Sequence, residues 1–161
     1  MTLVLYRIDD RLIHGQVVVG WGQPLDIGFI VLVDDTVAAE EWEQELYRMG
    51  VPPEMEVYFH STEDAIKHLT KYRSDPRAGI LLTGDIATMR RLVDAKGIPA
   101  VNVGGIHSAS SRVQRLRYVF LTPAEEQQLR DLAARGVSVT AQDVPGARPV
   151  SLDDLLAGSE L

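Results

Sequence analysis

Short apolar segments alternate with amphipathic segments along most of the chain. The segment Ile27–Val33 is apolar throughout, which is typical of a strand buried on both faces of a sheet. Other short apolar runs resemble it. The predicted strands are Leu3–Ile8, Ile27–Val33, Glu56–His60, Gly79–Thr83, Ala100–Val103, Tyr118–Leu121 and Val137–Ala141.

Hydrophobic residues at helical spacing lie in the segments between these strands. The predicted helices are Ala38–Met49, Ser61–Tyr72, Asp85–Lys96 and Thr122–Arg135. The first of them places Ala39, Trp42, Leu46 and Met49 on one stripe. Such a stripe is typical of a helix that packs on a sheet, so we expect Trp42, like Trp21, to be a packing residue.

Capping residues give these helices defined ends. Ser61 and Asp85 are expected N-caps. Thr122 begins the last of the four with a capping box, because proline follows it and Glu125 stands three positions further on. Glycines at the ends are predicted terminators. These glycines are Gly50, Gly97 and Gly136.

Repetition of strand, helix and strand favours a largely parallel sheet with helices on both faces. We therefore predict an α/β fold, a three-layer domain with a twisted sheet of about six or seven strands. The sequence has no internal repeat and no long linker, so residues 1–161 are predicted to form a single domain. The tail, residues 146–161, is expected to hold one short helix, Leu152–Leu156, capped by Ser151.

Composition excludes several classes of protein. The chain has 161 residues, of which 45% are hydrophobic and 24% charged, as in ordinary globular domains. Its formal charge of −7 argues against a nucleic-acid partner, and no apolar run approaches the ~20 residues of a membrane span. Cysteine is absent, which excludes disulfides and thiolate chemistry. The N-terminus lacks the features of a signal peptide, so we expect a cytoplasmic protein.

Polar residues concentrate where the predicted strands end. In an open parallel sheet, ligands bind beyond the carboxyl ends of the strands. The polar junctions there are Asp9–His14, Asp34–Thr36, His60–Thr62, Thr83–Asp85 and Asn102–His107. We therefore expect candidate crevice residues in this group. They include Asp35, Asn102, Gly104, Gly105 and His107.

The first junction, RIDDRLIHGQV, carries the strongest chemical signal. It combines two carboxylates, Asp9 and Asp10, with the guanidinium of Arg11 and the imidazole of His14. The following segment, GQVVVGW, is predicted to begin a helix, whose free backbone N–H groups at Gly15 and Gln16 would face an anion. An imidazole beside such donors is typical of a phosphoryl site, in which a ring nitrogen attacks phosphorus.

Structural interpretations stand beside the chemical one. His14 alone could be a packed structural histidine, the two aspartates could form a turn, and Arg11 could belong to a surface ion pair. Gly104 and Gly105 could form a turn that needs positive φ or an amide cradle for phosphate. Asp34 and Asp35 favour a different chemistry, metal-dependent phosphotransfer or an aspartyl phosphoacceptor.

The remaining histidines and a basic cluster are further candidate functional groups. His60, His68 and His107 match no metal-binding spacing, so we predict no metal site. The sequence has neither a GxGxxG motif nor a GxxxxGK motif followed by Ser or Thr, so we expect no nucleotide cofactor either. Three arginines, Arg112, Arg115 and Arg117, lie close together in an acidic chain. They form either a solvated edge or a docking surface for an acidic partner.

The motif RIDDRLIHGQV resembles the active-site signature of the B component (IIB) of mannose/fructose/sorbose-type sugar phosphotransferase systems. Three later segments, Ile30–Ala39, Val101–Ile106 and Leu121–Pro145, resemble other parts of this family. The resemblance covers about residues 2–145, nearly the whole chain. It departs from the family pattern at His107–Ser111 and in the C-terminal tail.

The resemblance implies a histidine phosphocarrier. His14 would accept a phosphoryl group from a phosphohistidine of the A component (IIA) on its δ1 nitrogen. It would pass the group to a sugar as the membrane components IIC and IID move that sugar inward. Arg11 would hold the phosphate, and Asp9 or Asp10 would orient the loop. Family members often form homodimers, and their sugar selectivity lies chiefly in the membrane components.

Two further functions remain open from the sequence. One is a regulatory phosphoprotein that keeps the His14 relay without a transporter. The other is a small-molecule binding module that carries no phosphate. For the phosphocarrier we expect a shallow, exposed site, because two partners must reach His14 in turn, and donors from Arg11 and the backbone near Gly15 must offset the phosphoryl charge.

Overall fold

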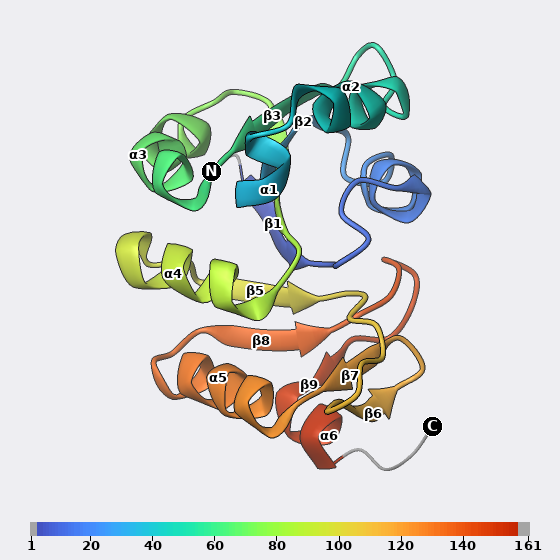
Figure 1. Cartoon of the computed structure of the whole chain (residues 1–161), viewed down its shortest axis with the longest axis vertical. Helices are drawn as coiled ribbons and strands as arrows, with labels where there is room; N and C mark the ends of the chain where they lie inside the picture. Colours follow the sequence, from blue (N-terminus) through green and yellow to red (C-terminus); the bar gives the residue numbers. More distant parts are fainter. Residues whose placement is uncertain (1–2, 158–161) are drawn as a thin grey trace.

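The computed structural model describes residues 3–157, which form a seven-stranded sheet, a two-stranded sheet and helices on both faces of the larger sheet (Figure 1). The larger sheet has the strand order β3-β2-β4-β1-β5-β8-β9. Its strands are β1 (Leu3–Ile8), β2 (Ile27–Val33), β3 (Glu56–His60), β4 (Ala78–Thr83), β5 (Ala100–Val103), β8 (Ser138–Ala141) and β9 (Val150–Ser151). Every pair is parallel except β8 with β9. The predicted fold class, a mainly parallel three-layer α/β domain, is confirmed.

The sixth predicted strand, Tyr118–Leu121, lies outside this sheet. Its counterpart β7 (Val119–Leu121) pairs antiparallel with β6 (Val113–Leu116) in the two-stranded sheet. The hairpin is tied to the loop after β5, because Phe120 N donates to Ile106 O at 3.0 Å. An apolar run shows that a strand forms but not which strand it pairs with, so this part of the prediction was wrong. The unpredicted β9 completes the larger sheet instead.

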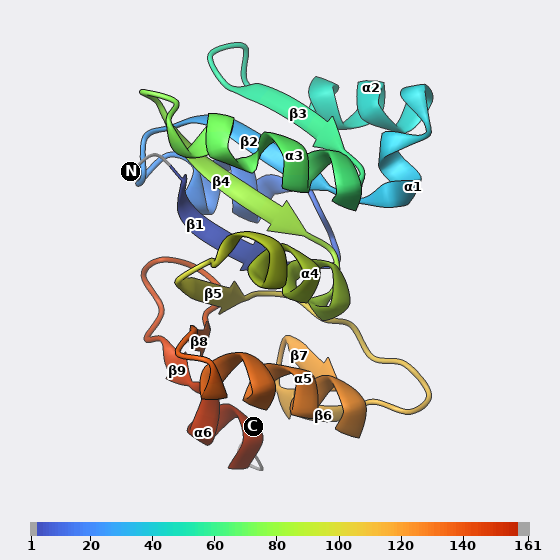
Figure 2. The same ribbon diagram turned by 90° about the vertical axis from the view of Figure 1, so that its left-hand side faces the viewer.

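Two separate hydrophobic cores cover the two faces of the sheet. One core packs under α3 (Thr62–Arg73), α4 (Ile86–Lys96), α5 (Pro123–Ala134) and α6 (Leu152–Ala157). The other packs under η1 (Gln16–Trp21), α1 (Asp35–Ala38) and α2 (Glu41–Met49). In Figure 1 the first group lies to the left and below, and η1 and α2 lie to the right. Figure 2 looks onto the side covered by α3, α4 and α5.

Side-chain caps begin the helices that follow the strands. Ser61, Asp85 and Thr122 each accept a bond from the backbone three residues on, and Thr122 with Glu125 completes the predicted capping box. Ser151 likewise accepts from Asp154 N at 3.1 Å at the start of α6. The predicted caps are therefore confirmed.

Glycine ends two of the predicted helices in the expected way. Gly97 and Gly136 have φ of 66° and 90°, whereas Gly50 follows α2 with φ of −90°. The predicted tail helix is present as α6, although residues 158–161 of the tail lie outside the described residues. The single-domain assignment of residues 1–161 stays a prediction. Within residues 3–157, no helix has the length and apolar character needed to cross a membrane.

The predicted helix Ala38–Met49 is divided in the structure. Residues Asp35–Ala38 form α1, and α2 begins at Glu41. The side chains of Trp42, Leu46 and Met49 are 62%, 58% and 81% exposed, so the prediction that this stripe packs in the core is wrong. The opposite side of α2 attaches the helix, because Tyr47 packs on the core and Gln44 donates to the end of α1.

Candidate active site

The loop after β1 lies between two other loops at the carboxyl edge of the sheet. β1 is flanked by β4 and β5, and Ile8 aligns with Thr83 on one side and Val103 on the other. The ladder continues past the strand, since Asp9 N donates to Thr83 O at 2.9 Å and Asp10 N to Gly105 O at 2.8 Å. The start of the loop is therefore fixed from both sides.

A strained turn then brings the chain back toward Asp9. Leu12 N donates to Asp9 O at 3.0 Å, and Leu12 has φ of 61°, in the left-handed region that costs energy for a residue with a Cβ. Gly84 makes room for this turn, because a Cβ there would lie 2.9 Å from Leu12 Cδ2. The turn brings the imidazole of His14 next to the carboxylate of Asp9.

Asp9 is the centre of the site. Its carboxylate is fully buried, accepts from Arg11 Nε at 2.9 Å and Nη2 at 2.8 Å, and accepts from Arg7 Nη2 at 3.2 Å. His14 Nε2 lies 3.3 Å from Asp9 Oδ2. Burial alone would raise the pKa of Asp9, but His14, Arg11 and Arg7 outweigh it and hold that pKa well below its usual range. Asp9 is therefore an anion at neutral pH, and four nitrogen atoms of three side chains, Arg7, Arg11 and His14, lie around it.

The two ring nitrogens of His14 have different surroundings. Nε2 faces the Asp9 carboxylate, whereas Nδ1 accepts a bond from Gln16 N at 3.3 Å. A ring nitrogen beside a carboxylate carries the proton, and one that accepts a bond carries the lone pair. The side chain of His14 is 20% exposed, which is less than we expected for a shallow, exposed site. The arrangement leaves Nδ1 as the nucleophilic atom of the imidazole.

Arg7 supports the site from below and was not singled out by sequence reasoning. Its side chain is fully buried, and its guanidinium donates to Asn102 Oδ1, Gln142 O and Asp143 O as well as to Asp9. Burial lowers its pKa, against the opposing effect of Asp9. The signal available in the sequence was an arginine inside an otherwise apolar strand, since such a residue needs several acceptors when buried.

A ring and a glycine enclose the Arg7 guanidinium. Its central carbon lies 4.9 Å from the ring centroid of Trp21, which is buried as predicted and donates to Asp143 O at 3.1 Å. On another side, a Cβ at Gly104 would lie 2.3 Å from Arg7 Nη2. A glycine at position 104 therefore lets the backbone of this loop approach the Arg7 guanidinium closely.

The Gly104–Gly105 turn serves packing and not the positive φ that one prediction named. Among residues 3–157 the glycines with positive φ are Gly97 and Gly136, not Gly104 or Gly105. A Cβ at Gly105 would lie 3.0 Å from both Arg11 Nε and Asp9 Oδ1, so the absence of a side chain lets this loop contact the pair. The Gly104 N–H donates to Ile8 O at 2.7 Å, which leaves it bonded within the sheet edge and not turned toward a ligand.

Asp10 and His107 form a second pair at the rim of the site. Asp10 Oδ1 lies 2.5 Å from His107 Nδ1, and Asp10 Oδ2 accepts from His107 N at 2.8 Å. His107 is largely exposed, and its carbonyl accepts from Arg112. The two aspartates of the motif thus differ in environment, because Asp9 is buried and Asp10 ties two loops together at the surface.

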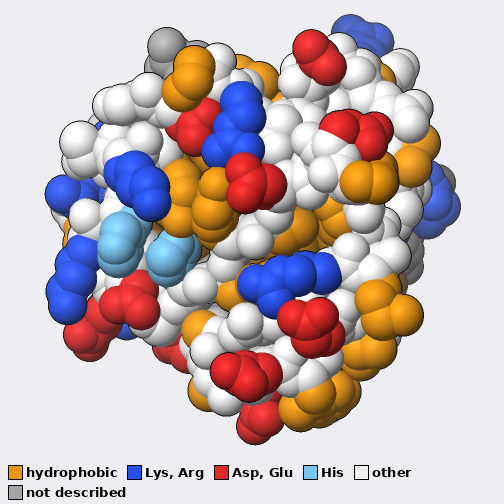
Figure 3. Space-filling view, turned by 90° about the horizontal axis from the view of Figure 1, so that it is seen from above, with side chains coloured by type: hydrophobic (Ala, Val, Ile, Leu, Met, Phe, Trp, Pro, Cys, Tyr) orange, Lys and Arg blue, Asp and Glu red, His pale blue; other side chains and the backbone are white. Residues whose placement is uncertain are grey.

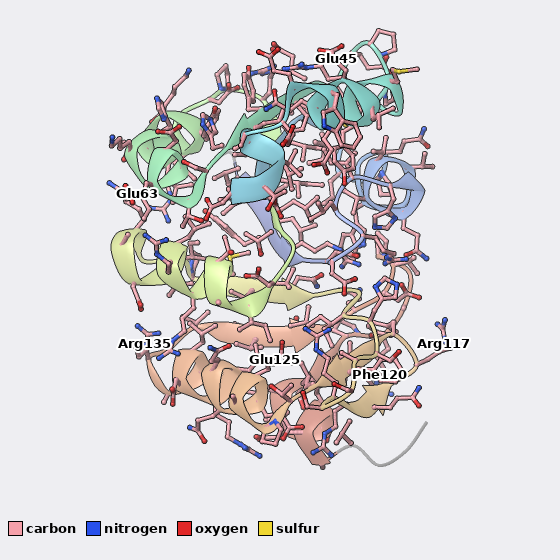
Figure 4. All side chains as sticks on the ribbon, in the orientation of Figure 1. Glu45, Glu63, Arg117, Phe120, Glu125 and Arg135 are labelled. Carbon is pink, nitrogen blue, oxygen red and sulfur yellow. The ribbon has the colours of Figure 1, made fainter. Side chains whose placement is uncertain are left out.

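A hollow of about 210 Å³ opens beside Arg11. It is lined by Arg11, Gly105, Ile106, His107, Arg117, Tyr118 and Phe120. Figure 4 labels Arg117 and Phe120, which reach this side of the molecule from the β6–β7 hairpin. Arginine, histidine and aromatic side chains therefore surround a small depression next to the His14 loop.

Other predicted crevice residues have structural contacts of their own. Asp35 accepts from Thr62 N at 2.8 Å and Thr62 Oγ1 at 3.2 Å, so it anchors the start of α3. His60 contacts Tyr72 and stacks on His68. Burial lowers the pKa of His60, and so does the neighbouring His68. None of the contacts described for residues 3–157 joins Asp35 or His60 to the His14 loop.

The three clustered arginines are held by carboxylates. Arg112 pairs with Glu125 at 2.9 Å, Arg115 with Glu126 at 2.6 Å and Arg117 with Asp143 at 3.2 Å. Arg112 and Arg115 thereby fasten the β6 region to α5, while Arg117 is largely exposed. Within residues 3–157, no group of three or more acidic or histidine side chains could hold a metal ion.

Comparison with known proteins identifies the family. The family described as the PTS system sorbose subfamily IIB component, where PTS stands for phosphotransferase system, matches residues 3–161. The chain belongs to this IIB family. It is 33% identical over 157 residues to the N-acetylgalactosamine-specific phosphotransferase enzyme IIB component 1 of Escherichia coli, covering 95% of this chain and 98% of that one.

Two further relatives extend the comparison of this IIB component. The mannose-specific EIIAB component of Escherichia coli is 30% identical over 161 residues, covering 98% of this chain and 49% of that protein. The crystal structure of the IIBSor domain of the sorbose permease from Klebsiella pneumoniae matches with a TM-score of 0.89 at 28% identity, covering 100% of this chain and 99% of that one.

The comparisons confirm the family resemblance seen in the sequence. A PTS IIB component is a phosphotransferase of sugar uptake, which accepts a phosphoryl group from IIA and transfers it to a sugar. The chain therefore has that activity, and the remaining question is which of its residues perform it.

Proposed function

We propose that His14 Nδ1 is the atom of this IIB component that carries the phosphoryl group. The observation that supports it is the pair of contacts made by the ring, with Nε2 against the buried Asp9 carboxylate and Nδ1 facing Gln16 N. A neutral imidazole held in this tautomer directs its lone pair away from the carboxylate. Nδ1 can then attack phosphorus without first losing a proton.

The first transfer forms one N–P bond and breaks another. Nδ1 of His14 attacks the phosphorus of the IIA phosphohistidine, and the bond to the IIA imidazole breaks. The ring of His14 becomes positively charged, and the Asp9 carboxylate 3.3 Å from Nε2 stabilises that charge. The Gln16 N–H, released from the Nδ1 lone pair, donates to a phosphoryl oxygen.

Arg11 supplies charge for the phosphoryl oxygens. Asp9 occupies its Nε and Nη2, while Nη1 has no hydrogen-bond partner among residues 3–157. The interaction with Asp9 raises the pKa of Arg11 further, so the guanidinium stays charged. Its remaining donor can bond a phosphoryl oxygen and offset part of the roughly two negative charges that the phosphoryl group adds.

The second transfer returns His14 to its starting state. A sugar hydroxyl attacks phosphorus, the bond to Nδ1 breaks, and the hydroxyl proton passes to a base or to water. The ring is then again a neutral imidazole with its proton on Nε2.

The proposal includes the partners and the place of action. The mannose-specific relative combines IIA and IIB in one name, which supports a IIA protein or domain as the phosphoryl donor. We further propose that membrane components IIC and IID present the sugar, and that the chain works in the cytoplasm at the inner face of the membrane. A homodimer stays a prediction.

Phosphoryl transfer to single variants tests the proposed roles. With phosphorylated IIA, the wild type and His107→Ala should acquire acid-labile, base-stable phosphate, and His14→Ala should acquire none. Membranes containing IIC and IID should then discharge the label to sugar. Label that remains on the protein in such membranes would favour the regulatory phosphoprotein, and absence of label on the wild type would favour a binding module. Label on His14→Ala would contradict the proposal.

A further inference from the structure

The helix α2 presents an apolar face that no part of residues 3–157 covers. Trp42, Leu46 and Met49 lie at positions i, i+4 and i+7 and are 62%, 58% and 81% exposed. All nine residues of α2 are described, and none of them is buried. Three large apolar side chains on one exposed helix face are typical of an interface, because isolated domains seldom leave such a patch open.

Carboxylates surround this face. Glu40, Glu41 and Glu45 are exposed and Glu43 is half-buried, against a single guanidinium at Arg48, which pairs with Glu45 at 2.8 Å. These four acids and one base give the α2 face a net charge of −3. Figure 3, which looks down on the end of the molecule that carries α2 and α3, shows hydrophobic and acidic side chains side by side at the surface.

The segment that leads into α2 begins near the His14 loop. Asp34, at the end of β2, caps α1, and α2 follows α1 after two residues. A Cβ at Gly84 would lie 2.9 Å from Leu12 Cδ2 of the His14 loop and 3.7 Å from Asp34 Oδ2. The segment that leads into α2 therefore starts at the same edge of the sheet as the His14 loop.

We propose that the α2 face docks this IIB component onto a Lys/Arg-rich, partly apolar surface of the membrane-spanning partner that presents the sugar. The inference rests on the proposed function, in which such a partner exists. The loops of membrane proteins on the cytoplasmic side carry an excess of lysine and arginine. An apolar stripe rimmed by carboxylates complements such loops in both charge and hydrophobicity.

Charge also argues against two other occupants. An anionic lipid surface would repel the carboxylates around the stripe. A second copy of the chain would bring two faces of net charge −3 together, which is unfavourable for association. A cationic partner would instead attract the carboxylates around the stripe.

The two transfer steps, measured separately, test the docking surface. The double variant Leu46→Gln/Met49→Gln should accept phosphate from IIA at the wild-type rate. Its sugar phosphorylation with IIC/IID membranes should fall about tenfold at subsaturating protein, since exposed apolar anchors of this kind dominate binding. Val113→Gln is the matched control, because Val113 is 52% exposed on β6, and it should leave both steps unchanged. Thermal unfolding of each variant verifies the fold.

A charge variant provides a second, independent readout. Glu41→Gln/Glu45→Gln should weaken the dependence of the membrane step on salt without affecting the IIA step. The inference is overturned if the apolar variant keeps full membrane activity, if it slows only the IIA step, or if its sole effect is to dissociate a homodimer. Failure of the proposed function itself looks different, because the wild type would then acquire no label on His14.

Discussion

At the scale of single residues, Asp9 organises the site more than His14 does. One fully buried carboxylate contacts Arg7, Arg11 and His14, so it holds two guanidinium groups in place and also favours one tautomer of the imidazole. The motif could not distinguish Asp9 from Asp10, because both follow β1 directly. The fold distinguishes them, because Asp9 is fully buried and lies so close to Gly105 that a Cβ there would be 3.0 Å from its Oδ1, whereas Asp10 pairs with the exposed His107.

Asp9→Asn should destabilise the protein by about 3–5 kcal/mol at neutral pH, because it leaves the buried Arg7 without a counter-charge. The folded-state pKa of Asp9 lies below its unfolded value of 3.8, so its contribution is complete above about pH 4. That contribution is lost as the pH falls further, toward the folded-state pKa. Urea unfolding at pH 7 and pH 3 should therefore show a difference between wild type and variant that shrinks in acid.

Asp10→Asn is the control for this prediction. Asp10 is only partly buried and pairs with the exposed His107, so its loss should cost about 1 kcal/mol or less. Equal destabilisation by the two substitutions, or a difference for Asp9→Asn that grows in acid, would contradict the role assigned to Asp9.

Gly104→Ala tests the packing of Arg7. The new methyl group would lie 2.3 Å from Nη2 of a guanidinium that four acceptors hold in place, so we expect a loss of about 1–3 kcal/mol in the free energy of unfolding. Gly15→Ala is the matched substitution, since a Cβ there meets nothing within 4 Å. Chemical denaturation compares them, and equal stability of both variants would show that Arg7 can move aside.

At the scale of elements, the sequence located most strands and the helix caps correctly. The apolar run Ile27–Val33 coincides with β2, because a strand covered on both faces has no polar position. The caps at Ser61, Asp85 and Thr122 were also readable, since each depends on a hydrogen bond within four residues. A hydrogen bond between residues close together in the chain can therefore be predicted from a short stretch of sequence.

Features that depend on distant partners could not be predicted in the same way. The segment after His14 forms a π-helix, η1, and β9 exists only because it pairs with β8. The stripe on α2 has the periodicity of a core-facing helix, yet periodicity does not show whether the covering surface belongs to the same chain. The acceptors of Arg7 lie as far away as Gln142, so its role emerged only from the fold.

The capping box of α5 should be worth a measurable amount of stability. Thr122→Ala removes the bond to Glu125 N at 3.0 Å, and we expect a loss of about 1 kcal/mol in the free energy of unfolding. Thr70→Ala, at an exposed position inside α3, should change stability by less than about 0.5 kcal/mol. Urea titration measures both, and an unchanged Thr122→Ala variant would show that α5 does not need its cap.

At the scale of the whole molecule, the sheet order places the site at its most constrained edge. β1 lies between β4 and β5, with a hydrophobic core on each face. The His14 loop is bonded to the loops after both neighbours, through Thr83 and Gly105. Such a frame can accept and lose a doubly charged group without changing its fold.

Phosphorylation should therefore alter the molecule locally. Backbone amide NMR shifts of the phosphorylated and free forms should differ chiefly in residues 9–16, which form the His14 loop, and in residues 102–107, which contact β1 and that loop. Helices α3, α5 and α6, packed on the face opposite to η1, should be unaffected. Large shifts across those helices would contradict a rigid frame and point to a coupled conformational change.

The nitrogen that carries phosphate tests the central claim most directly. Nitrogen-15 and phosphorus-31 NMR of the chain phosphorylated by IIA distinguishes the two ring nitrogens of His14. The contacts of Nε2 with Asp9 and of Nδ1 with Gln16 N predict phosphate on Nδ1 and a proton on Nε2. Phosphate on Nε2, or on any residue other than His14, would contradict the account.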